Sequence, residues 1–64
     1  MMQTDVLRPD TEVLFQFGLG SRWRVGYIRG RRLEPDGAWW YRVYDPEDKD
    51  VKDVLPSDVR PALD

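Results

Sequence analysis

Large apolar side chains alternate with polar ones at a period of two in several short runs of the chain, as they do in strands with one buried face. The longest run, 22–32, is predicted to be the central strand. One of its faces holds Trp23, Val25 and Tyr27, and the other holds Arg24, Gly26 and Ile28. We expect the aromatic face to be buried, with Trp23 at a barrel mouth, and the arginines to line the outer wall.

The same alternation predicts strands on either side of the central one. A strand at 13–17 points Val13, Phe15 and Phe17 inward. A strand at 38–44 points Trp39, Tyr41 and Val43 inward and leaves Trp40 and Tyr44 on the outer face or at a rim. Short strands at 51–55 and 60–63 complete the set of five.

Glycine and proline mark the turns and bends. The segments 18–21 and 34–37 are predicted turns, because glycine tolerates positive φ and proline presets φ. Gly26 and Gly30 inside the central run indicate a bulge or bend of the kind that curls a small sheet. Residues 56–59 are predicted to form a single helical turn that Ser57 caps.

No apolar pattern with a period of 3.6 persists along the chain, so the predicted fold class is all-β. The 64 residues make one domain near the lower size limit for an independent core. We expect residues 12–64 to form a five-stranded, strongly bent small barrel with one short helical turn before its last strand. Residues 1–11 are expected to be a flexible arm or an extra edge strand.

Composition narrows the classes of function. The chain has no cysteine and no histidine, so it lacks a catalytic thiol, an imidazole base and a thiolate metal site. The acidic loop lacks the glycine and terminal glutamate of a calcium loop. We therefore expect no enzymatic activity, no metal and no cofactor. No apolar run is long enough for a membrane span and the start shows no signal pattern, which predicts an intracellular protein, cytoplasmic or, in a eukaryote, nuclear.

The formal net charge is −2, but the two signs are segregated. Residues 22–32 carry five arginines and no acid, whereas residues 45–53 carry five acids and two lysines. These runs are either solvated faces that pair across neighbouring strands, or a basic edge for an anion and an acidic edge for a cation. The five arginines are Arg22, Arg24, Arg29, Arg31 and Arg32.

The order of these motifs resembles the Tudor-like members of the Src-homology-type small barrels. The most specific piece is the 54–61 segment Val-Leu-Pro-Ser-Asp-Val-Arg-Pro, which is similar to the Tudor ending that leads through a helical turn into the last strand. The Trp-x-Val-Gly-x-Ile segment at 23–28 fits the second strand of that family. The resemblance covers residues 13–63.

The resemblance implies an aromatic cage that holds a methylated lysine or arginine through cation–π contacts. Phe17 and Trp23 match two walls of that cage. If Asp45 matches the aspartate of the family's loop, the remaining cage positions are Val43, Pro46 and Asp48, where the family places two aromatic residues and an asparagine. If the alignment shifts by one residue, Tyr44 supplies the third wall. The resemblance thus implies an incomplete cage with acidic neighbours.

Three interpretations of function stay open at this point. The first is a protein-interaction module that binds an extended or basic peptide of a partner at an aromatic mouth with an acidic rim. Its expected ligand-binding residues are Phe17, Trp23, Trp40, Tyr44, Asp45, Glu47 and Asp48, and Trp40 is also a candidate for weak self-association. The alternative is binding of DNA or RNA through the five arginines of the central strand. A docking domain that acts on a single protein is a third interpretation, and no membrane partner is expected.

Overall fold

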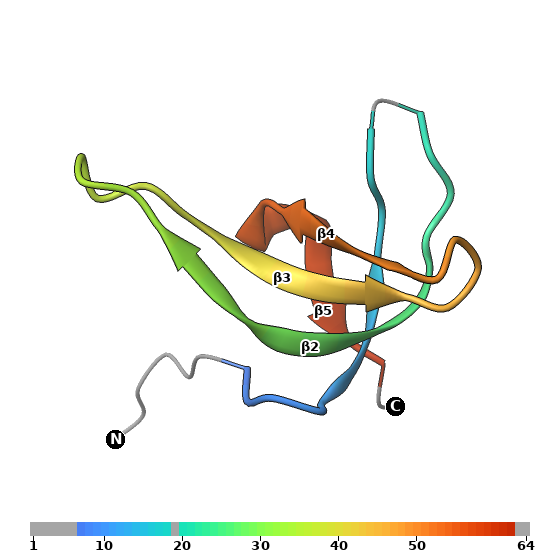
Figure 1. Cartoon of the computed structure of the whole chain (residues 1–64). Helices are drawn as coiled ribbons and strands as arrows, with labels where there is room; N and C mark the ends of the chain where they lie inside the picture. The colour runs from blue at the N-terminus through green and yellow to red at the C-terminus, as the bar shows by residue number, and fades with distance from the viewer. Residues whose placement is uncertain (1–6, 19, 63–64) are drawn as a thin grey trace, which may run out of the picture.

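A computed structural model of the chain describes residues 7–18 and 20–62. Five strands and one 3₁₀ turn follow one another in this part of the chain (Figure 1). Their bounds are β1 (Glu12–Phe15), β2 (Arg24–Leu33), β3 (Trp39–Asp45), β4 (Asp50–Val54), η1 (Pro56–Asp58) and β5 (Val59–Pro61). The predicted all-β class, the five strands and the short helical turn before the last strand are confirmed.

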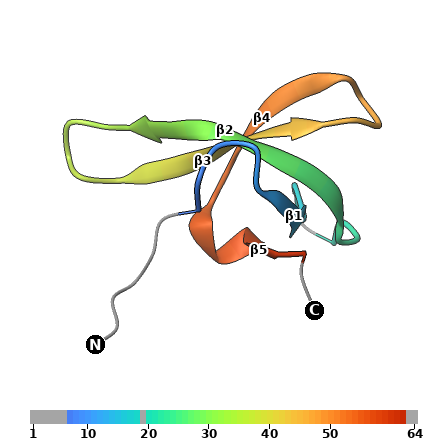
Figure 2. The same ribbon diagram turned by 90° about the horizontal axis from the view of Figure 1, so that it is seen from below.

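The strands form one antiparallel sheet in the order β4-β3-β2-β1-β5. β2 is therefore the central strand, as predicted. β4 and β5 are the two edges and do not pair with each other, so the sheet is not closed. From below, the β2–β3 and β3–β4 hairpins extend in opposite directions from the middle of the molecule (Figure 2). Pro61 lies in the edge strand β5, where a missing N–H is tolerated.

The core lies on the inner face of this sheet. Val13 and Phe15 from β1 are fully buried, as are Ile28 from β2 and Val43 from β3. These four pack with three further buried side chains, Tyr41, Val54 and Val59. The predicted inward positions of β1 and β3 are thus confirmed, except that Trp39 is only half-buried at the edge of the core.

Phe17, which we expected inside, is 45% exposed. β1 ends at Phe15, because the next residue turns toward η1. The Gln16 N–H donates to the Asp58 carbonyl oxygen at 3.1 Å, and its side-chain amide donates to the Asp58 carboxylate at 3.1 Å. The alternation of β1 therefore does not extend to Phe17.

The two faces of β2 are the reverse of those predicted. Gly26 and Ile28 face the core, and Arg24 faces the same way, whereas Val25 and Tyr27 are 39% and 37% exposed on the outside. The inversion follows from the space available above Gly26. A Cβ atom there would lie 2.7 Å from Phe15 Cε1, 2.7 Å from Val43 Cγ1 and 2.8 Å from the Tyr44 carbonyl oxygen. β2 can cross the core this closely only where the inward residue has no side chain.

The predicted bend in β2 is confirmed as a shift of register. Ile28 pairs with Val43 but Gly30 pairs with Arg42, which leaves Arg29 as the extra residue of a bulge. The turn that closes the β2–β3 hairpin contains Gly37 at φ 95°, and its N–H donates to the Glu34 carbonyl oxygen at 3.0 Å. Ser57 does not cap η1. The N-cap residue is Leu55, whose hydrocarbon side chain cannot accept a hydrogen bond, and proline at the start of η1 removes one of the donors that a cap would satisfy.

The segment before β1 lies along β2 and β3. Asp10 donates its N–H to the Ile28 carbonyl oxygen at 2.7 Å, and the Ile28 N–H donates to the Thr11 carbonyl oxygen at 2.9 Å. The Leu7 N–H donates to the Tyr41 hydroxyl oxygen at 3.1 Å, and the Leu7 side chain packs against the core. The rest of the expected arm, residues 1–6, lies outside the described residues.

None of the helices in the described ranges has the length and apolar character that crossing a membrane requires.

Candidate functional site

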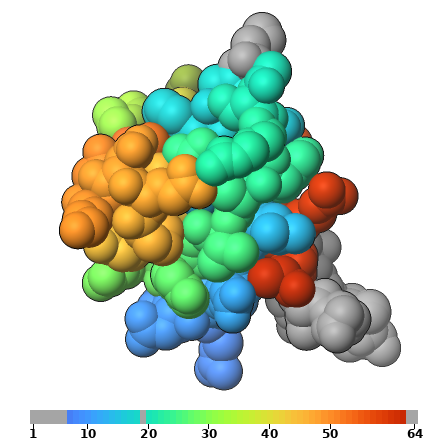
Figure 3. Space-filling view, turned by 90° about the vertical axis from the view of Figure 1, so that its right-hand side faces the viewer, coloured from blue at the N-terminus to red at the C-terminus, as the bar shows by residue number. Residues whose placement is uncertain are grey.

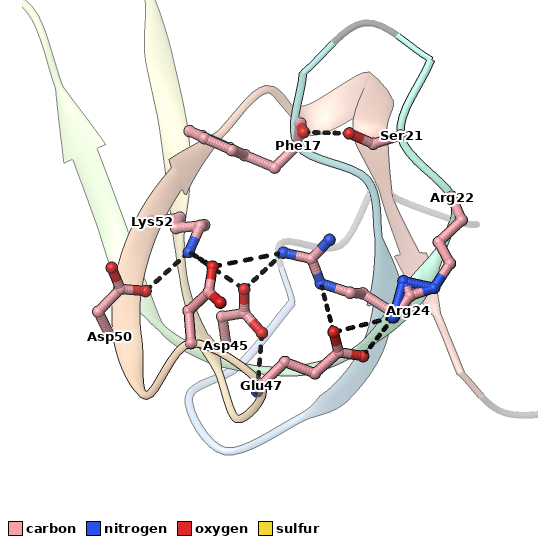
Figure 4. A network of polar contacts seen from close by, with 9 residues as sticks. Phe17, Ser21, Arg22, Arg24, Asp45, Glu47, Asp50 and Lys52 are labelled. Atoms are coloured by element: carbon pink, nitrogen blue, oxygen red, sulfur yellow. Dashed lines mark hydrogen bonds and ion pairs between the residues drawn. The ribbon is translucent and has the colours of Figure 1, made fainter.

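Charged side chains gather where the start of β2 meets the β3–β4 turn, and we call this group the polar cluster (Figure 4). In the space-filling view the turn, in orange, lies directly beside the teal and green chain that enters β2 (Figure 3). Three cations and four acids give the cluster a formal charge of 3 − 4 = −1. Its members are Arg22, Arg24, Asp45, Glu47, Asp48, Asp50 and Lys52.

Asp45 is the centre of the polar cluster. It is the last residue of β3 and fully buried, because it continues the inward alternation of Tyr41 and Val43. Its carboxylate accepts a hydrogen bond from Arg24 Nη2 at 2.6 Å and another from the Glu47 N–H at 3.0 Å, and it lies 3.1 Å from Lys52 Nζ. A buried carboxylate needs such partners, since removing it from water without them is costly.

These contacts set the ionisation of Asp45. Burial opposes the charged form and acts to raise the pKa of the carboxyl. The hydrogen bonds from Arg24, Lys52 and the Glu47 N–H together outweigh burial, and they lower the pKa of Asp45 from 3.8 to about 2. The same contact with Asp45 raises the pKa of Arg24. Asp45 is therefore a structural anion rather than an acid poised to exchange protons near neutral pH.

The Lys52 ammonium lies among three carboxylates. Oxygen atoms of Asp45, Asp48 and Asp50 come within 4.8 Å of one another, a spacing that could hold a metal ion. Lys52 Nζ is 3.1 Å, 2.8 Å and 2.8 Å from these three carboxylates in turn. Its hydrogen bonds to Asp48 and Asp50 raise the pKa of Lys52. The cation of this acidic group is thus supplied by the chain itself.

The remaining acid of the cluster pairs with arginine. Arg22 Nη2 reaches both carboxylate oxygens of Glu47, at 2.8 Å and 2.7 Å, on the exposed rim. Arg24 Nε has no hydrogen-bond partner among the described residues and lies 4.0 Å from Glu47 Oε1. The acidic rim expected from the sequence is present, but cations of the chain already contact its carboxylates.

The opposite face of the sheet carries an apolar surface that we call the outer strip. Tyr27 on β2 pairs with Tyr44 on β3, which pairs with Val51 on β4, and the neighbouring row pairs Val25 with Leu14 on β1. Val25, Tyr27 and Val51 are 39%, 37% and 48% exposed, and Tyr44 and Leu14 are half-buried. The outer strip consists of Leu14, Val25, Tyr27, Tyr44 and Val51.

Alternation along the sequence placed Tyr44 of this strip on the outer face or at a rim, but its β2 members were missed because the aromatic face of β2 was assigned to the core. Val25 and Tyr27 were correctly placed on one face, but that face is the outer one. A signal was available in β3. Asp45 has the same parity as Tyr41 and Val43, so period two predicts an inward carboxylate and requires inward cations to face it. Arg24 and Lys52 are those cations, which would have turned Val25 and Tyr27 outward.

The four rings expected to bind ligand make no ring-to-ring contact with one another in the described ranges, where Trp39 contacts Tyr41. Each of the four instead carries a cation of this chain, at 4.1–5.6 Å from the ring centroid. The ring–cation pairs are Phe17 with Lys52, Trp23 with Arg60, Trp40 with Arg32 and Tyr44 with Arg29. Of the expected acidic residues, Asp45 is buried, whereas Glu47 and Asp48 are exposed at 53% and 60% of their side chains.

The five arginines of the expected basic strand also separate. Arg22, Arg24 and Arg32 pair with acids, the last with Glu34 and Asp53 at 3.0 Å and 2.8 Å. Arg29 and Arg31 form no ion pair with the described residues and lie over the rings of Tyr44 and Trp39. Most of the basic run therefore serves ion pairs within the fold.

Comparisons of the chain with protein-family models, with curated proteins and with solved structures found no match to any of them.

Proposed function

We propose that this chain is a non-enzymatic protein-interaction module that binds an extended segment of a partner protein on the outer strip. The observation that carries the proposal is the inversion of β2. A domain of 64 residues has little apolar area to spare, yet its central strand leaves Val25 and Tyr27 in water beside Tyr44 and Val51. Contiguous apolar surface of this kind marks interaction sites, and tyrosine is enriched at their energetic centres.

The polar cluster supports the choice of the outer strip over the mouth beside Phe17. A basic side chain arriving at the mouth would compete with Arg22 for Glu47 and with Lys52 for Asp48 and Asp50. Beside the polar cluster Phe17 is an exposed ring among the described residues, and that ring already lies 5.6 Å from Lys52 Nζ. In the outer strip Arg29 lies over Tyr44, but no described cation lies over Tyr27, and Val25 and Val51 are exposed apolar side chains without a charged competitor.

The fold type that we propose is a Tudor-like small barrel. Five strands with a 3₁₀ turn directly before the last one support it, since the resemblance of the 54–61 segment places a helical turn at that point. A methyl-lysine reader is the family function this implies. The outer strip is better supported than this reader function. A cage needs several rings around one cation, whereas each of the four candidate rings contacts a different cation of the chain.

Nucleic-acid binding is the second candidate, and one observation favours it. Arg29 and Arg31, on either side of Gly30, have no acid within ion-pair distance in the described segments. Arginine without an internal carboxylate is well suited to phosphate, and an adjacent ring can stack on a base. Such binding would fall steeply as ionic strength rises.

A selection from random displayed peptides tests the proposed function. Peptides enriched on the unmodified chain are measured against Tyr27→Ser with Val51→Ser, and against the matched mouth variant Phe17→Ser. We expect binding to fall more than about tenfold in the outer-strip variant and to persist in Phe17→Ser, since truncating an interface anchor typically costs 1–2 kcal/mol or more.

Trimethyl-lysine peptides and single-stranded oligonucleotides are measured in parallel. If Phe17→Ser loses peptide binding and the outer-strip variant keeps it, the binding site lies beside Phe17 rather than on the outer strip. Binding of the oligonucleotide that Arg29→Glu with Arg31→Glu abolishes, without any peptide binding, would replace the proposal by the second candidate.

A further inference from the structure

We infer that the outer strip takes an extended peptide in which two acidic residues flank an apolar stretch. The inference rests on the proposed function and adds the chemistry of the partner. It starts from the two ends of the strip, where arginines lie over aromatic rings and make no ion pair with the described residues.

Arg29 marks one end. It is the extra residue of the β2 bulge, and its guanidinium lies 5.0 Å from the ring centroid of Tyr44, a member of the strip. Arg60 marks the other end. It pairs across β1 with Leu14, which pairs with Val25, and its guanidinium lies 4.1 Å from the ring centroid of Trp23. Both side chains are therefore on the outer face.

Arg31 also lies over a ring, that of Trp39, but it pairs with Tyr41, whose side chain faces the core, so Arg31 is not on the outer face. Four other arginines of the chain are engaged by acids. Those of the polar cluster pair with Glu47 and Asp45, and on the β2–β3–β4 surface Arg32 and Arg42 share Asp53 at 2.8 Å and 3.7 Å. Arg29 and Arg60 differ because a ring, rather than a carboxylate, lies beside each guanidinium. A guanidinium stacked on a ring keeps the N–H groups of its edge available for a bidentate contact with a carboxylate. The rings also restrict the arginine rotamers, which lowers the entropy lost on binding.

The separation of the two arginines sets the length of the peptide. From Arg60 on β5 to Tyr44 on β3 there are three strand steps, at about 4.8 Å each, and an offset of two residues, at about 3.4 Å each. The distance is therefore on the order of 16 Å across the sheet surface. An extended peptide covers it in about five residues. Apolar residues between the two acids would then lie over Val25 and Tyr27.

Charge argues against a second copy of the chain as the occupant. The segment with the most carboxylates, 45–50, is already engaged by Arg22, Arg24 and Lys52. A polyanionic nucleic acid would contact the same arginines, but the chain as a whole carries a net charge of −2 and the strip between the arginines contains Leu14, Val25 and Tyr27. An acidic peptide with apolar residues matches both the ends and the middle of the surface.

Heteronuclear NMR titration of the full chain tests the inference. The probe is the blocked peptide Ala-Glu-Val-Tyr-Val-Glu-Ala, whose two glutamates end a five-residue span and point to the same side of an extended chain. The matched control replaces both glutamates by lysine. We expect the acidic peptide to shift the amides of Val25, Tyr27 and Val51 and the guanidinium signals of Arg29 and Arg60, and to bind about tenfold more tightly than the lysine peptide. Arg29→Gln with Arg60→Gln should weaken the acidic peptide about tenfold, and Arg22→Gln should leave its binding unchanged.

A dispersed spectrum establishes that each variant is folded. If the double variant is unfolded, the titration is repeated with the single variants Arg29→Gln and Arg60→Gln. Equal or tighter binding of the lysine peptide, preference for a thymidine hexanucleotide, or shifts confined to Phe17 and residues 46–49 would each overturn the inference. If displayed peptides without acids bind the strip while the acidic probe does not, this inference fails and the proposed function stands. If no peptide binds the strip, both fail.

Discussion

The polar cluster and the outer strip lie on opposite faces of the same strands and are opposite in chemistry. Inside, β2 and β4 contribute Arg24 and Lys52 to a buried carboxylate at the end of β3. Outside, the adjacent residues of the same strands, Val25 beside Arg24 and Val51 beside Lys52, are in contact with water. The usual pattern, with apolar residues inside and charged residues outside, is therefore reversed at this end of the sheet.

The reversal indicates which region is structural and which is available for a partner. Every charge of the polar cluster has an opposite charge of this chain within 4.0 Å, so a ligand there must displace an existing contact. In the described structure Arg29 lies over Tyr44 of the outer strip, but Val25, Tyr27 and Val51 are exposed to water. A buried ion pair is weak grounds for high stability, whereas exposed apolar surface marks an interaction site. The following variants test each side of this contrast.

Gly26→Ala should give the largest effect. The added methyl group would lie 2.8 Å from the Tyr44 carbonyl oxygen and 2.7 Å from both Phe15 and Val43, and the carbonyl belongs to the β3 backbone. We expect a loss of about 3 kcal/mol in the free energy of unfolding, a large share of what a domain of this size has. Thermal and urea unfolding followed by tryptophan fluorescence measure it. Val25→Ala, the adjacent outward position, is the control and should cost less than about 1 kcal/mol. Similar losses in the two variants would contradict the assigned faces of β2.

Asp45→Asn should follow, with a loss of about 2 kcal/mol, because it leaves the Arg24 and Lys52 cations facing a neutral group that can still accept hydrogen bonds. Glu47→Gln is the matched control, since it removes an acid whose side chain is 53% exposed and should cost about 0.5 kcal/mol. Urea unfolding at neutral pH compares the two variants. A loss in Glu47→Gln as large as that in Asp45→Asn would show that the rim, rather than the buried carboxylate, holds the cluster together.

Acid should weaken the fold through the same residue. Because the pKa of Asp45 is lowered to about 2 in the folded chain, its contribution is complete above its ordinary value of 3.8 and is lost as the pH falls toward 2. We expect the unmodified chain to lose about 2 kcal/mol more than Asp45→Asn between pH 5 and pH 2. Urea unfolding at several pH values in this window gives the slope of the unfolding free energy against pH for the unmodified chain and for Asp45→Asn. Parallel slopes would mean that Asp45 is not the carboxylate responsible.

Much of the fold could be predicted from alternation. The apolar residues of β1 and β3 recur at a period of two, and only a strand places such residues on one face that can be buried. Alternation alone does not say which face of β2 is inner. That choice depends on the backbone approaching at Gly26 and on Asp45 requiring Arg24 and Lys52, which are contacts between strands far apart in sequence. The pairing of Arg60 with Trp23 was not predictable either, since it depends on how β5 lies against β1 and on the path of the chain before β2.

The smallest effect on stability is expected for Tyr27→Ser, and it gives the sharpest comparison between the two faces. Tyr27 is 37% exposed, so its removal should change the free energy of unfolding by about 0.5–1 kcal/mol. Ile28→Ala, one residue further along β2 and fully buried, should cost about 3 kcal/mol because it leaves a cavity beside Phe15 and Val43. Urea unfolding gives both numbers, and the displayed peptides give the binding of the same proteins. A folded Tyr27→Ser chain that no longer binds peptide would show that the outer strip serves binding rather than stability. A loss of unfolding free energy near that of Ile28→Ala would instead make Tyr27 a core residue and remove the basis for a docking surface there.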